Sequence, residues 1–272
     1  MIYNKSVNRG AVWLRGVNIL DPLPEADNAD VGSFTELMSY FSLRIQPQRF
    51  FYQGRYGGKS MKATKTKRIV ESGLLIAMAT VLTVLSMAFP LKLPFGGSVT
   101  LLSMLPIVLL SYRHGIKWGI CSGFVFSLIQ IATGIDNVKA FFVPEDYKLT
   151  AALGIIFLDY IAAYTVVGLG GFFRNRIKNP SASLALGAAA ALSFRYICHI
   201  ISGAVFFGMW AEWFFSQYEI GDKILSTFSG ASLSLIYSVV YNGLFMIPEI
   251  ILTVLASIVI GKIPAICKRI QK

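Results

Sequence analysis

The sequence predicts an all-α integral membrane protein built as a bundle of six transmembrane helices. Of its 272 residues, 55% are hydrophobic and only 14% are charged, whereas soluble domains carry about 25% charged residues. Its apolar runs also approach the roughly 20 residues that a helix needs to cross a bilayer. Both observations indicate that most of the chain faces lipid rather than water.

Six apolar segments account for this composition. We predict spans at residues 69–89, 99–112, 115–133, 150–173, 184–209 and 233–261. The second segment is short, so we expect a tilted or partly buried helix there. Pro90 and Pro94, followed by Gly96 and Gly97, predict a loop after the first span.

The basic residues predict the orientation of the bundle. They form short clusters between apolar runs, as in cytoplasmic loops, rather than one stripe, so the net charge of +11 does not indicate nucleic-acid binding. With six crossings, four clusters fall on one side: Lys62, Lys65, Lys67 and Arg68; Arg113 and Lys117; Arg174, Arg176 and Lys178; Lys262, Lys268, Arg269 and Lys272. The other side carries Asp136, Glu145, Asp146, Glu212, Glu219 and Asp222. Both termini are therefore predicted to be cytoplasmic.

Motifs for catalysis, metal binding and nucleotide binding are missing from the sequence. Cys121, Cys198 and Cys267 lie in or beside apolar segments without metal-ligand spacing, so we interpret them as small buried hydrophobes. There is no HExxH, no GxSxG and no GxxxxGK[ST] motif. We therefore expect no enzymatic activity, no cofactor and no capacity to power transport alone.

Ionisable residues inside the predicted spans are costly to bury and are candidates for function. They are Asp159, Arg195, His199 and Glu249, accompanied by the uncharged Asn242 and Gln130. Arg195, His199 and Gly203 are spaced by four and therefore share one helix face. Gly203 leaves room there for a ligand or for another helix.

Aromatic and polar residues near these positions could complete one pocket. Tyr160 follows Asp159, while Tyr237, Tyr241 and Asn242 lie about one turn apart on the last span. A carboxylate, an imidazole, an amide and aromatic rings together suit a flat, cationic, nitrogen-rich molecule.

The alternative interpretation is that the polar residues hold helices together. Arg195 could pair with a carboxylate, and Glu249, one residue after Pro248, could satisfy the backbone of a kinked helix. For Asp159 and His199 in combination, the cost of burial favours a binding role.

Several stretches in order along the chain resemble a known transporter family. They are residues 96–106, 111–115, 158–160, 195–208 and 237–242. From about Lys67 to the C-terminus, the chain resembles the thiamine-specific S component of energy-coupling factor (ECF) transporters. The resemblance implies a six-helix bundle of the S-component type, in the bacterial cell membrane, with thiamine bound near the outer face.

The resemblance also implies particular thiamine-binding residues. Asp159 matches the pocket carboxylate, and five other residues match pocket positions: Tyr160, His199, Gly203, Tyr237 and Asn242. Some members have Glu in place of Asp159, Trp in place of Phe207 and a loop Trp in place of Gly97. Either the stacking area is smaller here, or Trp210 and Tyr147 compensate.

The partners implied by the resemblance are a transmembrane coupling subunit and two ATP-binding-cassette ATPases. Small residues on the first helix of the family dock onto the coupling subunit, and the matching positions here are Gly73 and Ala77. Their spacing would allow close helix approach, although ordinary packing within the bundle would explain it equally.

Residues 1–60 are polar, aperiodic and unlike a signal peptide, so they could be a disordered tail. Reverse translation suggests a second interpretation. Residues 9–16 and 24–32 can be encoded by RNA that resembles, in order, the conserved blocks of the thiamine-pyrophosphate riboswitch, and residues 57–62 fit a ribosome-binding site before a start codon at Met61. We therefore expect an untranslated leader, and a native peptide from before Met61 would contradict this.

Three alternatives remain open for the ligand. The chain could be an S component for hydroxymethyl pyrimidine, an S component for riboflavin, or a membrane protein without a small-molecule ligand. The riboswitch-like leader argues against riboflavin.

Overall fold

The computed structural model of the protein describes residues 60–87, 99–142 and 148–267, and within these ranges the chain forms only helices and turns. Tyr147 and residues 1–59 of the expected leader lie outside the described residues. The longer helices are α2 (Ser60–Met87), α3 (Leu105–His114), α4 (Ile116–Thr133), α8 (Pro180–Phe206) and α11 (Gly230–Gly261). The predicted fourth span is a composite of α6 (Leu149–Ile155), η1 (Ile156–Ala162), α7 (Ala163–Thr165) and η2 (Val166–Gly171). Shorter helices lie in the connections: α5 (Ile135–Ala140), η3 (Gly208–Trp210), α9 (Ala211–Ser216) and α10 (Gly221–Thr227).

Five of the six predicted spans are long and apolar enough to cross a bilayer. In the described part of the chain they are Lys65–Met87, Ile116–Thr133, Leu149–Gly171, Pro180–Phe206 and Gly230–Gly261. The span predicted at residues 184–209 corresponds to α8 and begins earlier than predicted. Asn179 caps this helix by accepting hydrogen bonds from Ser181 N and Ala182 N, and Pro180 is its first residue.

The second predicted span is shorter than expected. Helix α3 begins at Leu105 rather than at residue 99, and nine of its ten residues are buried. Leu102 has a φ of 60°, a conformation that a leucine rarely adopts and that interrupts any helix before Leu105. We expected a tilted or partly buried helix here, and the burial of α3 is more complete than expected, because protein surrounds the helix on all sides.

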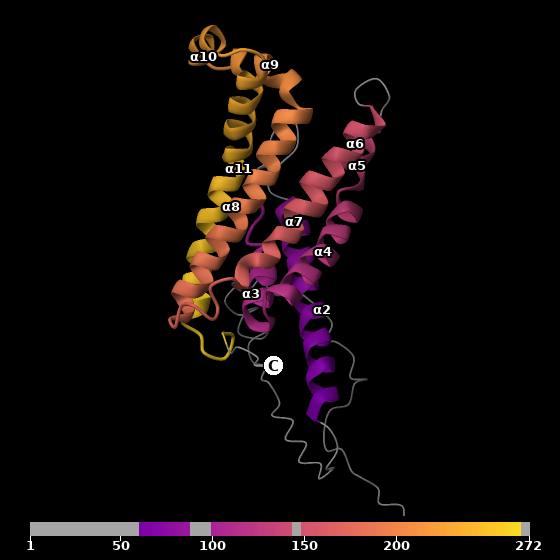
Figure 1. Ribbon diagram of the computed structural model, residues 1–272, viewed down its shortest axis with the longest axis vertical. Coiled ribbons are helices and arrows are strands. Elements are labelled where there is room, and N and C mark those ends of the chain that lie inside the picture. Colours follow the sequence, from indigo (N-terminus) through magenta and orange to yellow (C-terminus); the bar gives the residue numbers. More distant parts are fainter. Residues whose placement is uncertain (1–59, 88–98, 143–147, 268–272) are drawn as a thin grey trace, which may run out of the picture. The chain divides into compact units, whose positions relative to one another are not determined.

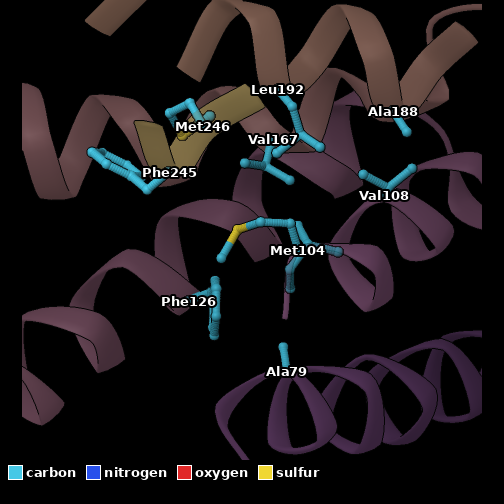
Figure 2. Close-up of a cluster of buried hydrophobic side chains, with 10 residues drawn as sticks. Ala79, Met104, Val108, Phe126, Val167, Ala188, Leu192, Phe245 and Met246 are labelled. Atoms are coloured by element: carbon cyan, nitrogen blue, oxygen red, sulfur yellow. The ribbon is translucent and has the colours of Figure 1, made fainter. Parts of the chain in front are cut away.

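Helices α8 and α11 pack side by side along much of their length (Figure 1). Segments α3, α4 and η2 pack together, and α3 and η2 of this group contact α8. One cluster of buried side chains joins these groups (Figure 2). It includes Ala79 of α2, Met104, Phe126 of α4, Val167 of η2 and Leu192 of α8. The core therefore joins helices that are far apart in sequence.

Small residues let η2 pack closely against its neighbours. Any Cβ atom added at Gly119 or Gly168 would overlap the other glycine's backbone. The Ser111 hydroxyl donates to Gly168 O and accepts from Gly171 N at 2.9 Å. These bonds satisfy backbone groups where the helix tightens into a 3₁₀ turn.

We expect Gly187→Ala to destabilise the protein. The new Cβ atom would overlap the carbonyl oxygen of Gly170 in η2, and overpacking of this kind costs about 1–3 kcal/mol. Thermal unfolding in detergent should occur at a lower temperature. The matched control is Gly73→Ala, because a Cβ atom at Gly73 meets nothing within 4 Å. Equal unfolding temperatures for the two variants would contradict this packing.

Candidate functional site

A cavity of about 420 Å³ lies among α2, α4, η1, α8 and α11. Seven of the nine predicted binding residues line it: Asp159, Tyr160, His199, Gly203, Phe207, Tyr237 and Asn242. Trp210 lies in η3, is 37% exposed and is not among the lining residues. Tyr147 lies outside the described residues. The structure therefore brings most of the predicted set to one hollow.

The acidic residue of the cavity sits on a π-helical turn. Asp159 and Tyr160 belong to η1, a π-helix that interrupts the α-helical hydrogen bonding of the fourth span. Such turns are rare and occur frequently at functional sites, because they change the direction in which neighbouring side chains point. In this case both side chains line the cavity.

Asp159 is held by two residues of α8. Its Oδ1 lies 2.8 Å from His199 Nδ1, and its Oδ2 accepts a hydrogen bond of 2.6 Å from Ser202 Oγ. The side chain of Asp159 is 20% exposed and that of His199 is 10% exposed. Because His199 Nε2 is buried without a hydrogen-bond partner among the described residues, it is available to a ligand.

The contact between α8 and α11 forms another wall. Asn242 Nδ2 donates to His199 O at 3.2 Å, and Ser238 Oγ donates to Ile200 O at 2.8 Å. A Cβ atom at Gly203 would overlap Ser238 Oγ and lie 3.0 Å from Asn242 Nδ2. Gly203 thus permits close helix packing and also leaves space in the cavity.

Aromatic rings cover one end of the cavity. Tyr237, Tyr241 and Phe207 line it, and Phe141 next to α5 meets Phe207 edge to face at 6.1 Å. Behind the tyrosines, Phe214 of α9 packs against Tyr237 at 5.4 Å and Tyr241 at 5.6 Å. The sequence did not predict Phe141 or Phe214, because both lie in connections between spans.

Polar residues of α2 and α4 complete the lining. Gln130, an uncharged polar residue of the third predicted span, donates from Nε2 to Thr83 Oγ1 at 3.0 Å. Both residues line the cavity, as do Thr133 and Asn137. The sequence did not predict Thr83, Thr133 or Asn137 as lining residues. Threonine is common within spans, and Asn137 lies in α5, beyond the third predicted span.

Arg195 also lines the cavity and forms a buried ion pair with Glu249. Its Nη1 lies 2.7 Å from Glu249 Oε1, and the two side chains are 4% and 0% exposed. The guanidinium lies 4.6 Å from the centre of the Tyr164 ring. This confirms the alternative that Arg195 pairs with a carboxylate. Glu249 therefore accepts a hydrogen bond from the Arg195 side chain, whereas the sequence also allowed it to bond to the helix backbone near Pro248.

Comparisons with known proteins agree on one family. The family model described as Thiamine transporter protein (Thia_YuaJ) matches residues 69–218. Thiamine transporter ThiT of Bacillus subtilis (strain 168) is 32% identical over 194 residues, covering 68% of this chain and 85% of that protein. A solved structure of ThiT from Listeria monocytogenes has a similar fold, with a TM-score of 0.54 and 18% identity, over 75% of this chain and 98% of that chain.

Proposed function

The chain belongs to the thiamine transporter protein family and is a multi-pass membrane protein, and on this basis we propose that it captures thiamine as the S component of an ECF importer. It is a transport subunit rather than an enzyme. The observation that carries the proposal is the cavity, where Asp159 and His199 meet at 2.8 Å among aromatic rings. Its volume of about 420 Å³ lies within the usual range for small-molecule sites.

The chemistry of thiamine matches the polar groups of this cavity. The thiazolium ring is a permanent cation, which a carboxylate such as Asp159 would offset and which the faces of Tyr160 and Tyr237 would attract. In the tautomer whose Nδ1–H donates to Asp159, Nε2 is an acceptor for the exocyclic amine of the aminopyrimidine. Phe207 and Asn242 would contribute stacking and hydrogen bonding.

We expect His199→Ala to weaken thiamine binding by about 1–3 kcal/mol, because the ligand loses a buried acceptor and Asp159 loses a partner. Isothermal titration calorimetry on the purified variant checks this. The control is His114→Ala, since His114 lies at the end of α3 and does not line the cavity. Wild-type affinity in both variants would remove His199 from the assignment.

The proposed partners are a transmembrane coupling subunit and two ATP-binding-cassette ATPases. Gly73 and Ala77 are both exposed on α2, and a Cβ atom at Gly73 would meet nothing within 4 Å. Packing within the described part of the bundle therefore does not account for their small size. This favours their use as the docking face for another helix.

We further propose that both termini are cytoplasmic. The Arg113 guanidinium donates to Ile266 O, and Arg174 Nη1 lies beside Gly115. Gly261 packs against Ser181 at the same end of α8 and α11. Three of the four basic clusters thus meet at one end of the bundle, which supports the positive-inside assignment.

The proposed function is tested by titrating the purified chain with thiamine, its phosphates, hydroxymethyl pyrimidine and riboflavin. Tryptophan fluorescence reports binding, and equilibrium dialysis with labelled thiamine provides a readout that does not depend on fluorescence. Saturable binding of thiamine is expected, with no binding of riboflavin. Saturation by riboflavin or hydroxymethyl pyrimidine in place of thiamine, or binding of none of them, would overturn the proposal.

A further inference from the structure

We propose that Glu249, which does not touch the ligand space, makes the cavity selective for a cation by neutralising Arg195. This inference rests on the proposed function and adds a specificity-determining residue to it. The cavity wall carries two ionic side chains of opposite sign, Asp159 and Arg195. Glu249 lies behind Arg195 and is absent from the lining residues.

The geometry keeps the charged groups of Asp159 and Arg195 with different hydrogen-bond partners. Within the described part of the chain, Asp159 bonds to His199 and Ser202, whereas Arg195 bonds to Glu249 at 2.7 Å. Arg195 remains protonated in proteins, so its charge cannot be removed by losing a proton. The Glu249 carboxylate therefore offsets the guanidinium charge, and Asp159 is the carboxylate of the wall that has no guanidinium or ammonium partner among the described residues.

Burial makes this cancellation matter for a ligand. Both members of the pair are at most 4% exposed, so water screens the guanidinium little. Without Glu249, a buried positive charge would face a cationic ligand across the cavity. It would also be free to attract Asp159 and draw that carboxylate away from the ligand.

A second detail supports a role beyond helix attachment. Arg195 Nε and Glu249 Oε2 are buried without hydrogen-bond partners among the described residues. A pair that serves only to join helices gains little from burying two ionic groups with incomplete hydrogen bonding, because their desolvation cost can exceed their attraction. A role in setting the charge of the cavity would explain why both ionic side chains are buried there.

The test compares thiamine with a neutral isostere in which carbon replaces the positively charged ring nitrogen. We expect Glu249→Gln to weaken thiamine binding by about ten- to thirtyfold, from an uncompensated charge at moderate effective dielectric. Binding of the isostere should change little. Adding Arg195→Gln to this variant removes the uncompensated charge and should restore most of the thiamine affinity.

Thr253→Val is the matched control, since Thr253 is fully buried one turn further along α11 and does not line the cavity. If unpaired Arg195 prevents Glu249→Gln from folding, the swapped pair Arg195→Glu with Glu249→Arg keeps both charges partnered. It places the carboxylate on the cavity wall, so the ratio of thiamine affinity to isostere affinity should rise.

Two results would overturn the inference alone, in a chain whose unmodified form binds thiamine. One is an equal loss of affinity for thiamine and the isostere in Glu249→Gln, as expected of a purely structural pair. The other is an unchanged affinity ratio in the swapped pair. Failure of the unmodified chain to bind thiamine would instead overturn the proposed function.

Discussion

Asp159→Ala is expected to lower thiamine affinity by about 3 kcal/mol or more, which is roughly a hundredfold or greater. The variant removes the only carboxylate among the lining residues of the cavity in the described structure. It also leaves His199 Nδ1 and Ser202 Oγ without the oxygens that they contact at 2.8 and 2.6 Å. Calorimetry or equilibrium dialysis on the purified variant measures the loss.

The control variant removes a carboxylate that does not line the cavity. Asp136 in α5 has a side chain that is 93% exposed, and its Oδ1 lies 3.5 Å from Lys139 Nζ. Asp136→Ala should therefore bind thiamine as the unmodified chain does. If Asp159→Ala retained the same affinity as this control, the carboxylate assignment would be wrong, whatever the ligand's route into the cavity.

The position of the cavity could be predicted because membrane burial makes polar residues conspicuous. Asp159, His199 and Asn242 stand out from apolar segments, and each has a cost that a function or a partner must offset. The spacing of His199 and Gly203 places them on one helix face, and the structure places both at the cavity. Residues of this kind are few in each span, so the sequence needs no contact information to select them.

The local geometry of Asp159 could not be predicted from the sequence. A π turn differs from an α turn by one residue in its hydrogen bonds, and segment 149–171 is apolar enough to be a span with either. Hydropathy fixes where a span lies but not the register of its backbone bonds. The same limit applies to η2, where the small residues at Gly168 and Gly171 packed against Ser111 set the tighter turn.

Contacts between distant segments were the other unpredictable feature. Arg195 was expected to pair with a carboxylate or to serve the pocket, but choosing Glu249 requires the relative register of α8 and α11. Phe214 reaches the cavity tyrosines from a short helix in a connection whose sequence has no apolar periodicity long enough to interpret. Such contacts follow from the fold rather than from local pattern.

Ala77→Trp is expected to abolish thiamine uptake while leaving thiamine binding intact. In the proposed importer, transport requires docking on a coupling subunit, and Gly73 and Ala77 are exposed small residues on α2. A tryptophan at Ala77 would hold a partner helix away from this patch. The residues of α2 that line the cavity, Thr83 and Met87, lie six and ten residues further along the helix, and Ala77 is not among the lining residues.

Two measurements separate the steps. Uptake of labelled thiamine into cells that express the chain with its partners should fall to the level of cells without it, and dialysis of the purified variant should give unchanged affinity. The control is Met78→Trp, because Met78 is also exposed, at 45%, but lies about 100° around the helix from Ala77. Equal uptake by the two variants would place the docking face elsewhere.

Loss of thiamine binding in Ala77→Trp would give a different result. It would mean that this face of α2 supports the cavity, because Ala77 is exposed and does not line the cavity.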